Sequence, residues 1–386
     1  MKTSFATCFF AIAVVCVQVV DEANAFASKS KAKAKSGRNT GGGGFGSSQK
    51  TTYIHTPDTG EKSQKLLEFL RGQKAKALDD VEIGFDKATG RRGLFCTSKI
   101  KKNQKFCRIP SDSVLALADP GKNGADAPTA AHRGANLLEM YMKNDQAKQL
   151  WSPYFDTLPT KDSDEFDRTP DFFADDDLEL LEFPRVISRA KQRKKEIAEV
   201  AADRGLTEDE LQYATWLTTS RQFRLYIPTP KDENDEIMPD EDEKGQIISK
   251  GGEKKPLYVL VPFIDIANHS SDQPNCKLTL IDPEKDDAWF ALEATRPIAA
   301  GKELLIAYGN GLESSVELFV NYGFVPLQNK IDPLMLQKGG DDTISDPSGW
   351  TTTLEEDKTV IEMAKDDPIL QKILQFRIRM KESYGN

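Results

Sequence analysis

The stretch Val261–Ser270 constrains this chain more than any other. Its apolar run stops abruptly at three polar side chains, Asp265, Asn268 and His269. Ligand sites are commonly built where buried apolar surface ends in a few convergent polar groups. A strand that simply ends in a polar turn gives the same pattern. The stretch alone therefore leaves both interpretations open, and the rest of the chain has to decide between them.

Length and charge narrow the classes of function. The chain has 386 residues, enough for about two domains with a sizeable core. Its formal net charge is −9, so there is no overall basic excess to neutralise phosphates, which argues against a general nucleic-acid-binding protein. Neither GxxxxGK[ST] nor a strand–GxGxxG–helix unit occurs, so the common nucleotide folds are not supported. An acidic protein can still act on basic protein substrates.

Cysteine and histidine are few and scattered. The cysteines are Cys8, Cys16, Cys96, Cys107 and Cys276. The first two lie in a segment that we expect to be removed, and the other three lack CxxC spacing, which favours neither a disulfide framework nor a structural zinc site. The histidines are His55, His132 and His269. Their wide separation makes a histidine-rich metal site improbable, and we expect no metal.

The first 25 residues have the pattern of a signal peptide. Lys2 precedes an apolar run from Phe5 to Val20, and Ala23-Asn24-Ala25 follows as a cleavage signal. The run has 16 residues, which is short for a membrane span. An N-terminal membrane anchor is the alternative interpretation.

Residues 26–60 are predicted to be a disordered transit peptide. Up to residue 57 they carry six Lys or Arg and no acidic residue, and they are rich in Ser, Ala and Gly. A signal peptide followed by such a segment, with Phe26 at the junction, resembles the two-part presequence of algae with secondary plastids. The resemblance implies the plastid stroma, a reducing compartment that suits free thiols. Secretion, with the basic segment as a linker, is the alternative.

The remaining chain predicts an α+β fold, with short strands at both ends and a helical block between them. Helical spacing of apolar residues predicts helices at Lys62–Leu78, in a block from about 128 to 210, at Leu211–Phe223 and at Ser314–Val320. Short apolar or alternating runs bounded by turn residues predict strands within Val81–Pro110, at Lys277–Ile281, at Trp289–Ala294 and within Ile298–Gly309. Eight acidic residues between Asp232 and Glu243 mark 231–256 as an exposed loop.

Six of these segments together resemble SET-domain methyltransferases of the Rubisco large-subunit lysine methyltransferase class. They occur in the order of that family: Arg92–Pro110, Trp151–Pro159, Trp216–Phe223, Val261–Ser270, Ala300–Gly309 and Asn321–Phe324. The resemblance implies a SET domain over residues 75–330, with several small sheets, a helical insertion and a knot-like C-terminal segment. Residues 331–386 resemble only the beginning of the helical substrate-binding domain of the class, and we expect them to be a short helical remnant of it.

The resemblance also implies an activity and a site. It implies a protein-lysine N-methyltransferase in which S-adenosylmethionine (SAM) and the lysine enter from opposite faces and meet in a narrow channel. The implied cofactor-binding residues are Gly90, Arg91, Arg92, Gly93, Leu94, Arg221, Asn268, His269, Tyr308, Tyr322 and Phe324. The implied substrate-binding residues are Arg221, Asp265, Tyr308 and Tyr322, with Tyr308 beside the transferring methyl as the catalytic residue. The implied partner is a protein with an accessible lysine, such as the Rubisco large subunit or another stromal protein. We expect neither nucleic-acid binding nor stable membrane association of the mature form.

Three departures from the family pattern keep alternatives open. Arg91 stands where the family often has the first glycine of G-x-G, Ser314-Ser315 stands where an Asn is usual, and about 55 residues follow the core. Taken from sequence alone, Arg221 could simply cap the end of its helix. Arg91 and the short C-terminus keep a non-catalytic peptide-binding module with the same fold as an alternative. A histidine acceptor is a second alternative, because relatives of the class can methylate histidine.

Overall fold

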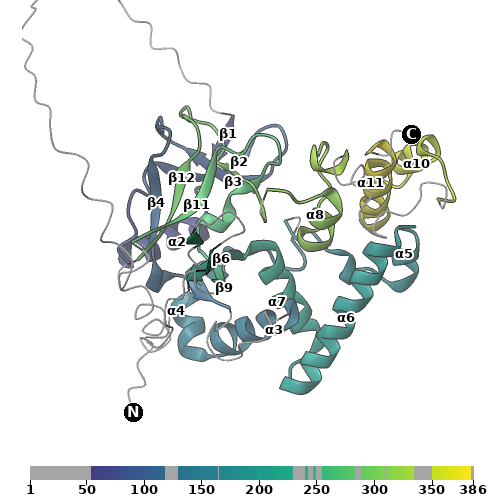
Figure 1. The fold of residues 1–386 in the computed structure, drawn as a ribbon, viewed down its shortest axis with the longest axis horizontal. Coiled ribbons are helices and arrows are strands. Elements are labelled where there is room, and N and C mark those ends of the chain that lie inside the picture. Colours follow the sequence, from purple (N-terminus) through teal and green to yellow (C-terminus); the bar gives the residue numbers. More distant parts are fainter. Residues whose placement is uncertain are drawn as a thin grey trace, which may run out of the picture.

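The computed structural model describes residues 54–117, 129–163, 165–228, 240–241, 247–248, 254–282, 288–309, 311–333 and 350–383. The predicted signal peptide and most of the predicted transit peptide lie outside these ranges. Strands gather on one side of the molecule and helices on the other, with the C-terminal helices beside α8 (Figure 1).

The first sheet brings the start of the described chain against the glycine-bearing turn. β1 (His55–Pro57), β2 (Val81–Asp86) and β3 (Arg92–Cys96) pair antiparallel in that order. His55 is buried, and its ring stacks on Phe95 with centroids 4.1 Å apart. The prediction that disorder extends to residue 60 is therefore wrong for His55–Pro57. A strand of three residues is too short to show an alternating pattern in the sequence.

A turn closed by one carboxylate joins β2 to β3. Asp86 Oδ1 accepts hydrogen bonds from the backbone N–H groups of Ala88 and Thr89, the arrangement by which Asp residues commonly initiate turns. Gly90 follows with φ +71°, a left-handed conformation that glycine adopts without steric cost. β3 then starts at Arg92, so residues 90–94 run from the turn into a buried strand.

Two further three-stranded sheets and two two-stranded pairs make up the rest of the β structure in the described residues. β11 (Cys276–Ile281), β12 (Trp289–Ala294) and β4 (Lys105–Pro110) form one sheet, and β5 (Leu115–Ala116), β9 (Lys254–Leu260) and β6 (Phe223–Pro228) form another. The two-stranded pairs are β7 (Asp240–Glu241) with β8 (Ile247–Ile248), and β10 (Asn268–His269) with β13 (Leu305–Ile306). The acidic loop predicted for 231–256 lies mostly outside the described residues. Residues 254–256 are the start of β9, so the predicted loop extends too far at its C-terminal end.

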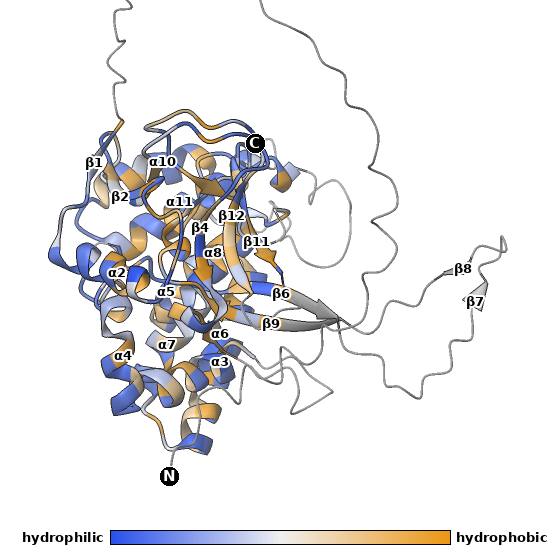
Figure 2. Cartoon of the chain, turned by 90° about the vertical axis from the view of Figure 1, so that its left-hand side faces the viewer, coloured by the Kyte–Doolittle hydropathy of each residue, from blue (hydrophilic) through white to orange (hydrophobic). Residues whose placement is uncertain are grey.

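Three helices of the helical part begin at polar caps. The helices are α2 (Glu61–Gly72), α3 (Ala130–Leu137) with a π-helical turn at Leu138–Met142, α4 (Asp145–Phe155), α5 (Asp175–Glu179), α6 (Pro184–Arg204) and α7 (Glu208–Arg221). The side chains of Thr129, Asn144 and Thr207 accept from the first-turn backbone of α3, α4 and α7. Such caps satisfy N–H groups that a helix start leaves unpaired. Most of the helices show both hydrophobic and hydrophilic residues (Figure 2), as expected when only one face is buried.

The C-terminal helices dock through a second core of their own. This core lies between α5, α6, α8 (Ser315–Tyr322) and α11 (Pro368–Ser383), separate from the larger core under the sheets. Phe376 of α11 stacks on Phe319 of α8 at 4.7 Å and meets Phe183 edge-on at 5.3 Å. Aromatic pairs of this kind stabilise by about 0.5–1.5 kcal/mol beyond the area they bury. The second core therefore fixes α8, and Tyr322 is the last residue of that helix.

A buried charge cluster holds α10 (Leu354–Met363) against α11. Asp357 Oδ1 lies 3.0 Å from Arg377 Nη2, and its Oδ2 lies 2.6 Å from Lys381 Nζ. All three side chains are nearly inaccessible to solvent. Glu182 supplies a second carboxylate, 3.2 Å from Arg377 Nη2, and balances the second cation. Removing one member of such a cluster leaves an uncompensated buried charge.

We therefore expect Asp357→Asn to lower the free energy of unfolding by about 3–5 kcal/mol, because Arg377 would keep only Glu182 and Lys381 would lose its carboxylate partner. Glu355→Gln on the same helix is the matched control. The Glu355 side chain is 83 % exposed and pairs with Lys358 at only 3.8 Å, so its loss should cost no more than about 0.5 kcal/mol. Urea unfolding followed by circular dichroism measures both. Equal losses for the two variants would contradict the buried cluster.

Candidate active site

The stretch Val261–Ser270 turns sharply after β9. Phe263 is fully buried and has φ +74°, a conformation that is rare for a bulky residue. The turn Ile264–Ile266 follows, and β10 begins at Asn268. Backbone strain of this kind persists only where surrounding packing enforces it, and it clusters at functional sites. Because of this kink, Asp265, the first polar residue after the apolar run, stays inside the protein and is only 7 % exposed.

A short parallel pairing brings the two most distant predicted site segments together. Asn268 pairs with Leu305 and His269 with Ile306, so Tyr308 lies two residues beyond the end of this pairing. The Tyr308 hydroxyl donates to the backbone carbonyl of Ala267 at 3.1 Å. Asn268 and Tyr308, which the family resemblance assigns to one site, therefore lie close together in the fold.

His269 serves as a hydrogen-bonding group. Its Nδ1 accepts from the backbone N–H of Tyr308 at 3.0 Å, which leaves the proton on Nε2, 2.7 Å from Ser271 Oγ. Burial lowers the pKa of His269 from 6.5 to about 4. The ring is consequently neutral at physiological pH. It fixes the backbone of Tyr308 without carrying charge into the site.

Asn268 points toward β3. Its Nδ2 donates to the backbone carbonyl of Arg92 and to Glu303 Oε1, both at 2.8 Å. Burial raises the pKa of Glu303, and the bond from Asn268 opposes that rise. Sequence reasoning missed Glu303, although it lies within the Ala300–Gly309 motif. The contact closes β3 against β10 and explains why residue 93 is a glycine. A Cβ there would lie 2.6 Å from Glu303 Oε1 and 2.8 Å from Asn268 Nδ2.

Four rings form an aromatic wall beside this pairing. We call Tyr308, Tyr322, Phe324 and His269 the aromatic group. Tyr308 lies 4.6 Å from Tyr322 and 6.4 Å from Phe324, and His269 lies 5.9 Å from Phe324, centroid to centroid. Burial raises the pKa of Tyr308 to about 12 and raises that of Tyr322 as well. Both phenols therefore stay protonated and neutral at physiological pH.

The side chains of Arg91 and Arg92, next to the glycine turn, point to different places. Arg91 meets the aromatic group, and Arg92 does not. The Arg91 guanidinium lies 5.8 Å from the Phe324 ring. The Arg92 side chain points elsewhere, toward Asp58 at 3.3 Å and Ser63 Oγ at 2.9 Å. A cavity of about 520 Å³ lies beside Arg92, with Phe85, Leu158 and Glu165 in its lining. Cavities that bind small molecules are typically of roughly 300–1,000 Å³.

Arg221 and Asp265 form an incomplete buried pair. Arg221 Nη1 lies 3.5 Å from Asp265 Oδ2, and the same nitrogen donates weakly to the Asp265 backbone carbonyl at 3.4 Å. Tyr154 provides the short contact, with its hydroxyl 2.7 Å from Asp265 Oδ2. Within the described residues, Arg221 Nε and Asp265 Oδ1 have no hydrogen-bond partner. A role for Arg221 as a mere helix cap is therefore not supported, because its side chain contacts Asp265.

The two charged groups influence each other's titration. Burial raises the pKa of Asp265, while Arg221 and the bond from Tyr154 oppose that rise. Burial lowers the pKa of Arg221, but the anionic neighbours, Asp265 first among them, raise it overall. Arg221 thus remains a cation, and the electrostatics of the pair depend on the state of the carboxyl.

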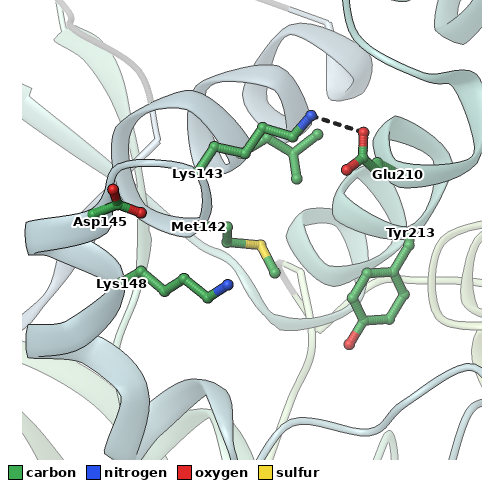
Figure 3. Close-up of a pocket in the computed structure, with 7 residues that line it drawn as sticks. Met142, Lys143, Asp145, Lys148, Glu210 and Tyr213 are labelled. Atoms are coloured by element: carbon green, nitrogen blue, oxygen red, sulfur yellow. Dashed lines mark hydrogen bonds and ion pairs between the residues drawn. The ribbon is translucent and has the colours of Figure 1, made fainter.

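A second hollow lies on the helical face and contains no predicted site residue (Figure 3). Its volume is about 300 Å³, and Lys143 crosses it to reach Glu210 at 2.7 Å. Met142 and Tyr213 also line it, at the π-helical turn and on α7.

Within the part of the chain that the structure describes, no cluster of three or more His, Cys, Asp or Glu could hold a metal ion. No helix among the described residues is both long and apolar enough to cross a bilayer.

Comparison with known proteins agrees with this architecture. Residues 91–309 match the family model described as "SET domain". The chain is 25 % identical over 260 residues to "Ribosomal lysine N-methyltransferase 4" of Saccharomyces cerevisiae (strain ATCC 204508 / S288c), covering 61 % of this chain and 49 % of that protein. The chain thus spans about half the length of this curated relative.

Two solved structures share the fold. "Crystal structure of the SET domain of LSMT bound to Lysine and AdoHcy" superposes with a TM-score of 0.56 at 14 % identity, over 85 % of this chain and 90 % of that chain. "Structure of Rubisco LSMT bound to AdoMet" gives 0.56 at 14 % identity, over 84 % and 90 %. The expected α+β SET fold, with several small sheets and helical segments, is confirmed.

The close approach at Gly93 gives a direct test of the site geometry. We expect Gly93→Ala to lower the free energy of unfolding by about 1–3 kcal/mol, because the added methyl must separate Asn268 from Glu303. Gly72→Ala is the matched control, since a Cβ there meets nothing within 4 Å. It should be neutral or slightly stabilising, by up to about 1 kcal/mol. Chemical denaturation measures both, and an unchanged stability for Gly93→Ala would argue against the contact.

Proposed function

The chain belongs to the SET-domain family, and we propose that it is a protein-lysine N-methyltransferase with SAM as the methyl donor. The single observation that carries the proposal is the arrangement around Tyr308. Its hydroxyl and the Ala267 carbonyl meet at 3.1 Å beside an aromatic wall. The name of the yeast relative, a ribosomal lysine N-methyltransferase, favours lysine over histidine as the acceptor.

The residues around this arrangement suit a charged amino-acid ligand. SAM carries a carboxylate, an ammonium and a sulfonium. Arg221 Nε and Asp265 Oδ1 are a buried donor and a buried acceptor without protein partners. Buried polar atoms normally have partners, so an unpaired donor and acceptor on adjoining side chains suggest a ligand with groups of both kinds. Gly93, where a Cβ would meet Asn268 and Glu303, lets β3 lie close to the segment that carries Asn268. The Asn268–His269 backbone and the aromatic group would complete the enclosure.

Bound SAM would supply an already activated methyl group, so the protein's part is to position an amine. A lysine in water is protonated, with a pKa near 10.4, and its charged form cannot act as the nucleophile. The apolar faces of Tyr308 and Tyr322 disfavour that charged form and so favour the neutral amine. The Tyr308 hydroxyl and the Ala267 carbonyl are polar atoms that can orient it for in-line attack.

Tyr308 acts here by orientation rather than as a base. Burial holds its pKa at about 12, so the phenol keeps its proton at physiological pH. Its oxygen can also accept weak C–H···O contacts from a polarised methyl group. The proton lost by the lysine goes to solvent before transfer. The half-buried Arg221 and the buried Asp265 balance each other's charge next to this position.

We propose a stromal protein as the substrate, with the Rubisco large subunit as one candidate. The proposal rests on the presequence resemblance and on the family class. The helices α10 and α11 would represent the short remnant of a substrate-binding domain. The second core packs α11 against α8, which ends at Tyr322. A substrate that contacts α10 or α11 would therefore act on Tyr322 through this packing.

Tyr308→Phe tests the activity. We expect the purified wild-type chain to transfer labelled methyl groups from SAM to lysine in stromal protein, and the variant to be slower by about 10²–10³-fold because an orienting hydroxyl is lost. Liquid-scintillation counting gives the rate, and residue-level mass spectrometry identifies the acceptor. Tyr141→Phe is the control. Its hydroxyl donates to the Ala116 carbonyl at 3.2 Å, outside the site, and its loss should leave the rate within about two-fold. A wild type that labels no protein beyond the Tyr308→Phe level would refute the proposal.

Phe26→Ala tests the proposed route to the plastid stroma. In an alga with a secondary plastid, the full-length chain fused to a fluorescent protein should accumulate in the stroma. Loss of the junction Phe should stop the fusion before the plastid while leaving entry into the secretory pathway intact. Phe45→Ala, within the same basic segment, should not change the destination. Fluorescence microscopy reads both, and secretion of the wild-type fusion would support the alternative.

A further inference from the structure

Tyr154 is buried against the site although it lies in a motif with no assigned role. It occupies the end of Trp151-Ser-Pro-Tyr154 on α4, and its side chain is 1 % exposed. Pro153 stands inside this last turn of the helix. The Tyr154 hydroxyl reaches across 111 residues of sequence to Asp265 Oδ2 at 2.7 Å. A buried phenol with one charged partner is a specific arrangement, because a Tyr hydroxyl needs a partner when buried and most find a backbone carbonyl or water.

Tyr154 determines how Asp265 meets Arg221. The phenol has one hydrogen to donate, and its pKa is raised well above the ordinary value by burial and by the neighbouring carboxylate, so it remains a donor. It engages Oδ2, and the guanidinium lies at a long 3.5 Å from that same oxygen. An unhindered Arg–carboxylate pair would instead close to about 2.7–2.9 Å and become bidentate. The long distance is what leaves Arg221 Nε and Asp265 Oδ1 without protein partners.

We propose that Tyr154 is a positioning residue of the cofactor site, which holds Asp265 back so that Arg221 and Asp265 stay available to the charged amino-acid end of SAM. This inference rests on the proposed function. Tyr154 touches neither ligand nor reacting atoms, and acts only through the carboxylate. Without its hydroxyl, Asp265 would rotate toward Arg221 and the two groups would satisfy each other. The binding energy of the ligand would then have to include breaking that pair.

Several charged or titratable groups act on Asp265 and so influence the pH dependence of ligand binding. These groups are Arg221 of α7, Tyr154 of α4, Arg92 of β3 and Tyr308 after β13, and Glu165 acts on Arg221. Burial raises the pKa of Asp265, and Tyr154 is one of the groups that lower it. Removing the hydroxyl takes this bond away, but the guanidinium that closes on the carboxylate in its place lowers the pKa of Asp265 by more, because a nearby opposite charge favours the charged form. A carboxyl with a lower pKa keeps its charge to a lower pH, so the acid-side loss of ligand affinity should move to lower pH in the variant.

The test is calorimetric titration of the full chain with SAM itself, between about pH 5 and 8. We expect Tyr154→Phe to bind SAM about ten-fold more weakly at neutral pH, the usual effect of losing one hydrogen bond to a charged group. Its affinity should also begin to fall at a lower pH than that of the wild type. Tyr141→Phe, which removes a buried hydroxyl bonded to the Ala116 carbonyl, should keep both the affinity and the pH profile.

A double-mutant cycle separates positioning from a general loss of packing. Asp265→Asn keeps the shape but removes the titrating charge, so its SAM affinity should lose the acid-side pH dependence. Tyr154→Phe added to it should cost little more, because both changes act through one interaction. Additive losses, or a Tyr154→Phe affinity equal to the wild type at every pH, would overturn the proposal. Thermal unfolding confirms that each variant is folded at the assay temperature.

These outcomes are distinguishable from a failure of the proposed function. If the wild-type chain binds SAM and Tyr154→Phe behaves as the wild type, only the positioning role is wrong. If the wild-type chain binds no SAM at any pH, the cofactor assignment itself is wrong, and the positioning role is refuted with it. Should Tyr154→Phe unfold, the flattened pH profile of Asp265→Asn still decides whether that carboxylate controls binding.

Discussion

The parallel pairing of β10 with β13 is the interaction on which the site depends. It has only two residues in each strand, and such a pair contributes little stability by itself. Its position matters more than its energy, because it joins the end of the kinked stretch Val261–Ser270 to the Ala300–Gly309 segment. Once it forms, Tyr308 Oη meets the Ala267 carbonyl and Tyr308 N–H meets His269, so two hydrogen bonds are placed by one pairing. Asn268 then ties the pairing to β3 through the Arg92 carbonyl.

So short a pairing needs support from the packing around it. On one side the larger core holds β9 and the strained Phe263, and on the other α8 presents Tyr322 to Tyr308. α8 is itself fixed by the stacking of Phe319 on Phe376 of α11. The C-terminal helices thus contribute to the site without lining it. Their buried charge cluster at Asp357 sets the register of α10 against α11 and so fixes the side of α11 that faces α8.

Local sequence patterns predicted the elements well and their long-range partners poorly. Alternation at 277–281 and 289–294 predicted β11 and β12, and the capping residues Thr207 and Ser314 stand at the helix starts. The family resemblance placed Asn268, His269 and Tyr308 in one site, and the structure brings them together. Tyr154 and Glu303 were missed because their roles come from partners 111 and 35 residues away. β1 was missed for the same reason, since a three-residue strand is defined by its partner β2 and not by its own pattern.

The incomplete pair Arg221–Asp265 is difficult to explain as a stabilising device. Burying two charges costs several kcal/mol per ion before their attraction is counted, and a separation of 3.5 Å recovers less of that cost than a tight bidentate contact would. Two apolar residues of similar volume would be as stable or more so. The fold nevertheless keeps both charges, and Tyr154 occupies the oxygen through which they would otherwise close. In the proposed cofactor site, the unpartnered atoms Arg221 Nε and Asp265 Oδ1 are the donor and the acceptor that would meet a bound third group.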